Sequence, residues 1–128
     1  MPKPSNYHKK GLNCAESMIK SFNEEHNENI PVSLGSGMGS GMRVGSICGA
    51  VNAAAMIIGY LKGRENHDEK NEAAIYTKEL MKIIREKYNS ELCLDLKKSK
   101  GSCSEIEDFT YDALNILLQQ EENTVKSI

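Results

Sequence analysis

The sequence feature that most constrains the fold is one long apolar segment, Ile47–Leu61. Only Asn52 and two glycines interrupt it, so a helix over these residues is apolar on nearly every side and must be covered by other elements. The segment has about 15 residues, fewer than the roughly 18 that a membrane-spanning helix needs. It therefore predicts a central buried helix, capped by Ser46 and closed at Gly63, and no membrane span.

Four further segments carry the signals of helices that would cover this core. Each begins at a capping residue and continues with helical spacing of apolar residues or a short helical turn. They run from Asn13 to about Asn27, from Asp68 to about Tyr88, from Ser90 through Glu91–Leu96, and from Ser102 to about Gln120. Strand-like alternation is confined to Leu92–Leu96, which is too short for a sheet. We therefore predict an all-α fold, an irregular bundle of four main helices in a single domain over residues 1–128, with frayed ends at 1–8 and 121–128.

Composition and charge exclude some classes of function. The chain has 16 Lys and Arg residues against 18 Asp and Glu residues, a net charge of -2, which argues against a nucleic-acid-binding protein. The first eight residues do not lead into the apolar segment of a secretory signal, so we expect a cytoplasmic protein. In a reducing compartment, cysteines serve more often as metal ligands or redox thiols than as structural disulfides.

A glycine- and methionine-rich segment, Gly35–Ser46, precedes the central helix and holds five of the ten glycines. Because Met38, Met42 and Val44 are interleaved with the glycines, we expect an ordered and packed loop instead of a flexible linker. Such a loop can form a nest of backbone N–H groups over a bound cluster or anion, with Arg43 neutralising its charge. The candidate cofactor-binding residues are Gly37, Gly39, Met42, Arg43, Gly45 and Gly49.

The four cysteines all fall in the first turns of predicted helices; they are Cys14, Cys48, Cys93 and Cys103. A helix N-terminus stabilises a thiolate, which is the form that binds metals and attacks electrophiles. We expect the four sulfur atoms to converge in one pocket about 10 Å across, close enough to share a metal or a cluster. We expect Cys48 to have the lowest thiol pKa, since it opens the most buried helix. Three interpretations stay open: metal ligands, redox thiols that form disulfides, or packing residues.

The pattern of motifs resembles the C-GCAxxG-C-C family of redox-active proteins. The matching parts are Gly11–Glu16, the glycine-rich loop, the segment Cys48–Ala53, Cys93 and Cys103. The resemblance runs from about Tyr7 to Leu118, and one family glycine is Ala53 here. The chain is also similar to the iron–sulfur-bearing domain of split-Soret cytochromes, although the absence of a CxxCH motif means that covalent haem is not implied. The resemblance implies a redox or metal-linked role.

We therefore predict a redox protein that binds a metal or an iron–sulfur cluster through Cys14, Cys48, Cys93 and Cys103, for electron transfer or redox sensing. The alternatives are a metal-free thiol/disulfide oxidoreductase or sensor, and a structural interaction module. An iron–sulfur cluster is the expected cofactor, with zinc or no cofactor as alternatives. His8 is a candidate to approach the cysteine pocket, and Lys97, Lys98 and Lys100 are candidates to dock an acidic redox partner protein. The sequence leaves a homodimer open.

Overall fold

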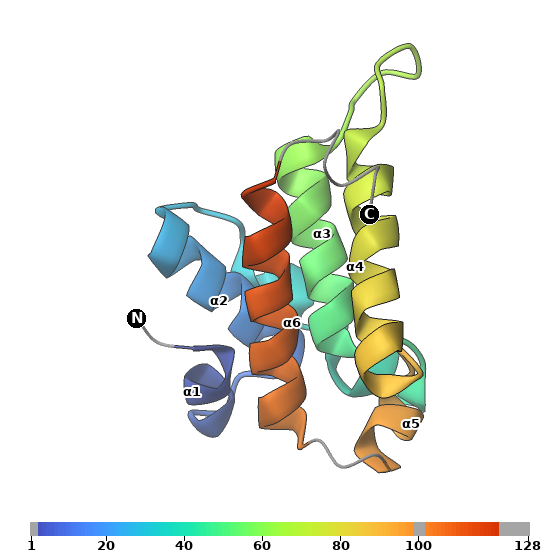
Figure 1. Ribbon diagram of the computed structural model, residues 1–128. Helices are drawn as coiled ribbons and strands as arrows, with labels where there is room; N and C mark the ends of the chain where they lie inside the picture. Colours follow the sequence, from blue (N-terminus) through green and yellow to red (C-terminus); the bar gives the residue numbers. More distant parts are fainter. Residues whose placement is uncertain (1–2, 99–101, 121–128) are drawn as a thin grey trace.

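The computed structural model describes residues 3–98 and 102–120, and its described parts are all-α (Figure 1). Four helices of 13 to 17 residues form the bundle: α2 (Cys14–His26), α3 (Gly49–Lys62), α4 (Glu72–Tyr88) and α6 (Cys103–Leu118). Two short helices, α1 (Pro4–Lys9) and α5 (Cys93–Lys98), and two single turns, η1 (Val32–Gly35) and η2 (Gly41–Gly45), complete the described elements. The predicted fold class and four main helices are confirmed. Lys100 and residues 121–128 lie outside the described residues, as do the side chains of Lys97 and Lys98.

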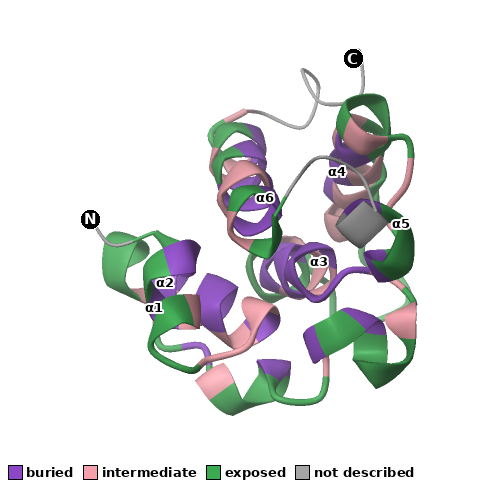
Figure 2. Ribbon diagram, turned by 90° about the horizontal axis from the view of Figure 1, so that it is seen from below, coloured by how far each residue is buried: buried purple, intermediate pink, exposed green. Residues whose placement is uncertain are grey.

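Helix α3 is the central element, as the apolar segment predicts. The view along the bundle shows it largely buried, with α2, α4 and α6 around it (Figure 2). Its buried side chains include Val51, Ile57 and Ile58, each at most 1% exposed. Burial of an aliphatic side chain of this size contributes roughly 1.5–3 kcal/mol, so α3 is a major source of stability. Within the described ranges, no helix has both the length and the apolarity to cross a membrane.

Three helix starts differ from their predicted positions. The short helix expected over Glu91–Leu96 is α5, which begins two residues later, at Cys93, because residues 91–93 pair with residues 46–48. Helix α3 begins after Cys48 and not after Ser46, because residues 46–48 are extended and pair with residues 91–93. The Cys48 N–H donates to the Glu91 carbonyl at 2.8 Å, and the Cys93 N–H donates to the Ser46 carbonyl at 2.7 Å. Helix α4 is capped by Asn71, whose side chain accepts the Ala74 N–H, instead of by Asp68. The starts at Asn13 and Ser102 are as predicted.

Residues 4–9 form helix α1, where a frayed end was expected. Pro4 occupies the first turn, where its missing N–H is not needed. The Ser5 backbone N–H and hydroxyl donate to the two carboxylate oxygens of Asp108 on α6, at 3.1 and 2.7 Å. The Tyr7 hydroxyl donates to Glu24 on α2. These long-range contacts hold a segment whose local sequence carries only a weak helix signal.

Candidate functional site

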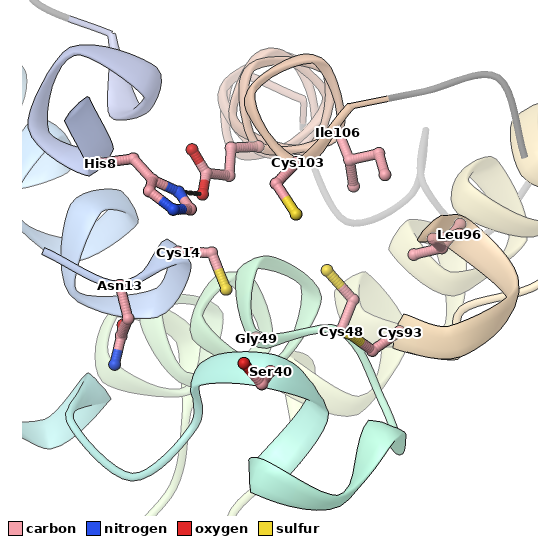
Figure 3. Close-up of a pocket in the computed structure, with 11 residues that line it drawn as sticks. His8, Asn13, Cys14, Ser40, Cys48, Gly49, Cys93, Leu96, Cys103 and Ile106 are labelled. Atoms are coloured by element: carbon pink, nitrogen blue, oxygen red, sulfur yellow. Dashed lines mark hydrogen bonds and ion pairs between the residues drawn. The ribbon is translucent and has the colours of Figure 1, made fainter. Parts of the chain in front are cut away.

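The four cysteines meet at one end of the bundle. Three of them are the first residues of α2, α5 and α6, and Cys48 is the N-cap of α3. Figure 3 shows their side chains directed into a common space. This space is a cavity of about 180 Å³. It is lined by His8, Asn13, Cys14, Ser40, Cys48, Gly49, Cys93, Leu96, Cys103, Ile106 and Glu107. The expected convergence of the four thiols on one pocket is thus seen in the structure.

The glycine-rich loop reaches the pocket through a left-handed turn. Four consecutive residues, Ser40–Arg43, have φ between 53° and 67°. Left-handed helical backbone costs a non-glycine residue roughly 1–2 kcal/mol, so the run is held by its surroundings. Gly41 is the one member without that cost, and a Cβ there would lie 2.5 Å from the Ser46 carbonyl oxygen and 2.6 Å from Cys93 Cβ. The turn therefore packs directly behind Cys93 and brings Ser40 to the cavity wall.

Gly49 permits the closest approach between α3, α2 and the loop. A Cβ on Gly49 would lie 2.5 Å from the Cys14 sulfur and 2.7 Å from the Met38 carbonyl oxygen. Asn13, which precedes Cys14, fixes the other side of this contact. Its side chain accepts the Glu16 N–H and donates to the carbonyls of Gly35 and Ser36, at 3.1 and 3.2 Å. The first turn of α2 is thereby attached to the loop.

A short backbone pairing places Cys48 and Cys93. Ile47 and Leu92 form an isolated antiparallel bridge, and the two hydrogen bonds that flank it fix Cys48 and Cys93 on adjoining segments. The second segment is held on α4 by Glu91, whose carboxylate accepts two hydrogen bonds from Arg85, at 2.9 and 2.6 Å. Arginine paired in this two-pronged way gives strong directional anchoring. The cavity wall at Cys93 therefore rests on α4 as well as on the loop.

Most of the loop residues predicted to bind a cofactor do not line the cavity. Of that set only Gly49 does. Gly37, Met42 and Arg43 are exposed, Gly39 lies against the Asn13 side chain, and Gly45 faces Leu94. Cofactor binding by these five residues stays a prediction; in the structure the left-handed turn leaves Met42 and Arg43 exposed, while Ser40 reaches the cavity wall.

Sequence analysis missed a carboxylate in the cavity wall. Glu107 is 1% exposed, and its Oε1 contacts Nδ1 of His8 on α1. Its other oxygen, Oε2, is buried and has no hydrogen-bond partner within the described part of the chain. The sequence analysis named His8 as a candidate to approach the cysteine pocket, and in the structure His8 lines this pocket (Figure 3). The available signal for Glu107 was its spacing of four residues from Cys103, which puts both on one face of α6.

Burial dominates the acidity of the two cysteines nearest the core. It raises the pKa of the Cys14 thiol to about 11, and the charges of Cys48 and Glu107 act in the same direction. Burial also raises the pKa of Cys48, although the backbone amides of Ala50 and Val51 oppose it. The expectation that Cys48 is unusually acidic is therefore wrong, because desolvation of the thiolate outweighs the helix N-terminus.

The four thiols are a set of ligands that suits a soft metal cofactor. Four thiols are the ligands preferred by iron–sulfur clusters and by structural zinc. Among residues 3–98 and 102–120, no three His, Cys, Asp or Glu side chains lie close enough together to hold one metal ion. The thiols instead stand around the cavity, each on a different element.

A comparison with protein-family models matches residues 12–119 to the family described as "Putative redox-active protein (C_GCAxxG_C_C)". This match covers most of the chain and includes all four cysteines. The chain belongs to the C_GCAxxG_C_C family. Within the C_GCAxxG_C_C match lie Glu107 and the whole glycine-rich loop, whereas α1 and His8 precede it. Neither the curated proteins nor the solved structures gave a match.

Proposed function

We propose that this protein is a redox protein that holds an iron–sulfur cluster through Cys14, Cys48, Cys93 and Cys103. The observation that carries the proposal is the convergence of four free thiols, from four separate helix starts, on one cavity. Thiolates are the usual protein ligands of such clusters. Membership of a family described as redox-active supports the same function.

The spacing of the sulfurs favours a cluster over a single ion. A cluster distributes its thiolate ligands over several iron atoms, so its ligands stand further apart than those of one tetrahedral ion. The four thiols line a cavity of about 180 Å³, and no three of them are grouped closely enough in the described structure to hold one ion, which fits a cluster better. Zinc, the alternative cofactor, requires all four sulfurs to coordinate one ion.

The residues around the thiols are suited to tune a bound redox centre. A cluster supplies one-electron transfer when it is bound. The Ser40 amide acts on the Cys14 sulfur, and the Ala50 and Val51 amides act on the Cys48 sulfur, each favouring negative charge there. Such dipoles stabilise the more negative, reduced state. We propose that one redox partner protein donates the electron and another accepts it, and that the protein works in the cytoplasm, where thiols stay reduced.

The proposal is tested by anaerobic reconstitution with ferrous iron and sulfide, followed by iron and sulfide analysis and by EPR of the reduced protein. We expect iron and sulfide in near-equal amounts and a cluster signal that is lost in C14S, C48S, C93S and C103S. The control is S104A, which alters a neighbour of Cys103 without removing a thiol. If the wild-type protein retained zinc without sulfide, or bound no metal, the proposal of an iron–sulfur cluster would be overturned.

The arrangement of Cys48 and Cys93 favours a second candidate, a thiol/disulfide function. These two buried thiols lie on the paired segments 46–48 and 91–93, and Cys93 is among the charges that act on Cys48. With peroxide as oxidant, two thiols and one H₂O₂ would give one disulfide and two water molecules. Peptide mapping after stoichiometric peroxide tests this. A Cys48–Cys93 disulfide that dithiothreitol reverses supports the candidate, and four unmodified thiols exclude it.

A further inference from the structure

The large apolar side chains that remain exposed are concentrated beside the cysteine cavity. Of eight such side chains among the described residues, four lie in two short segments, and they are Met42, Val44, Leu92 and Leu94. Val44 is 78% exposed and Leu94 is 57% exposed. Single exposed apolar residues are ordinary, but a cluster of them marks an interaction surface. We refer to these four residues as the apolar face.

The two segments form one surface on the outside of the cavity wall. A Cβ on Gly45 would lie 2.6 Å from Cγ of Leu94, so the Leu94 side chain rests against Gly45, next to Val44. Leu92 is joined to Ile47 by the isolated antiparallel bridge. Figure 1 shows α5 beside the loop that precedes α3. A partner on the apolar face would therefore contact the loop and α5 together.

Two charged side chains next to this face indicate what covers it. Arg43 is exposed and has no ion pair or hydrogen bond within the described part of the chain. Asp95 on α5 is also exposed, and its carboxylate accepts a hydrogen bond from the neutral Ser90 hydroxyl at 2.8 Å. The face thus presents one positive and one negative charge, and neither is paired with an opposite charge among the described residues.

A second copy of the chain fits this pattern better than a partner of one charge. A uniformly acidic surface would pair with Arg43 but repel Asp95, and a basic surface would do the reverse. In a two-fold dimer, residue i of one copy contacts residue j of the other and the reverse, so one arrangement satisfies both charges twice. The acidic redox partner expected from Lys97, Lys98 and Lys100 is the competing occupant.

We propose that the apolar face is the contact between two copies of this chain, with Val44 and Leu94 at its centre and Arg43 of each copy paired with Asp95 of the other. An apolar centre with a charged edge is the usual composition of such interfaces. This inference goes beyond the proposed function, because it requires no bound cluster. A standard interface buries about 800 Å² on each partner, and obligate dimers bury more. Four apolar side chains form only the centre of a small interface, so we expect a dimer that dissociates in about the micromolar range.

Sedimentation velocity of the full chain tests the proposal, under reducing conditions so that exposed Cys103 does not link two chains. We expect the mean mass to rise from that of one chain toward that of two between about 1 and about 500 µM protein. R43E and D95R each place like charges opposite one another, so each should raise the dissociation constant at least about tenfold. An equimolar mixture of R43E and D95R should associate again, because both contacts then pair opposite charges. An acidic partner surface does not produce this rescue.

A matched pair of variants changes apolar residues instead of charges. L94S removes a central contact and should weaken association at least about tenfold. I116S removes a side chain of similar exposure near the end of α6 that lies away from α5, and it should associate as the wild-type protein does (Figure 1). If R43E or D95R does not fold, as judged by circular dichroism, L94S and I116S supply the result. The proposal would be overturned by a wild-type protein that stays monomeric throughout, by folded R43E, D95R or L94S that associate as the wild type does, or by a mixture that stays monomeric.

Discussion

At the scale of single residues, Gly49 sets how closely α3 approaches Cys14. The G49A substitution would place a methyl group 2.5 Å from the Cys14 sulfur and 2.7 Å from the Met38 carbonyl oxygen. We expect it to lower the free energy of unfolding by about 1–3 kcal/mol, because backbone and sulfur must both shift. We also expect less bound iron after reconstitution. Urea unfolding and iron analysis measure the two effects.

Gly59 provides the matched control in the same helix. A Cβ there would meet nothing within 4 Å, so G59A should raise the unfolding free energy by about 0.4–1 kcal/mol through reduced chain entropy. It should leave the iron content unchanged. If G49A and G59A were equally stable, the contact between Gly49 and Cys14 would not constrain the pocket.

The raised thiol pKa values predict a specific pH dependence of alkylation in the metal-free protein. A raised pKa means that the reactive thiolate appears only at higher pH. Because the pKa of Cys14 is about 11, its iodoacetamide rate should still rise steeply above about pH 10, where an ordinary thiol has levelled off. Exposed Cys103 should be modified first at about pH 8. Peptide mapping across pH follows each cysteine in the intact chain. Preferential modification of Cys48 near neutral pH would contradict the dominance of burial.

At the scale of elements, the left-handed turn is the least expected part of the chain. Arg43 has φ of 67°, is exposed, and does not line the cavity. R43G should therefore raise the unfolding free energy by about 0.5–1 kcal/mol, since relief of backbone strain exceeds the added chain entropy. Iron content should not change. V44G is the control: Val44 has φ of -130°, so glycine there should only destabilise. If R43G also destabilised the protein, the turn would carry no strain at Arg43.

How far the sequence predicts these elements depends on the range of the contacts that form them. Asn13 and Ser102 were located correctly because a cap bonds to residues three positions away. The start of α3 was placed two residues early, since the pairing of Ser46 with Cys93 joins distant segments. Helix α1 was missed for the same reason. Four thiols at helix starts were predictable from local signals, whereas the burial of Glu107 depends on α1.

At the scale of the whole molecule, the site is a meeting point of helix starts and not a feature of one motif. Four elements each contribute one thiol, and the loop and α1 close the remaining sides. No single segment holds more than a fraction of the donor set. The site therefore exists only when the bundle is assembled, which couples any bound centre to folding.

Helix α1 contributes His8 to the cavity wall. The hydrogen bonds of Ser5 to Asp108 attach α1 to α6, and this attachment can be tested directly. The D108A substitution removes both acceptors of Ser5, while the contacts of Tyr7 with Glu24 and of His8 with Glu107 remain. Hydrogen bonds to a charged group contribute about 1.5–3 kcal/mol, so the amides of α1 should exchange with solvent roughly ten- to a hundredfold faster. Amides of α3 should keep their protection, because their opening requires global unfolding.

D112A, which removes an exposed carboxylate one turn further along α6, should leave exchange in α1 unchanged. In the metal-free protein, D108A should also speed alkylation of Cys14, since α1 carries the His8 side of the cavity wall. Unchanged exchange in D108A would show that α1 is held by its packing on α2 and does not depend on this link.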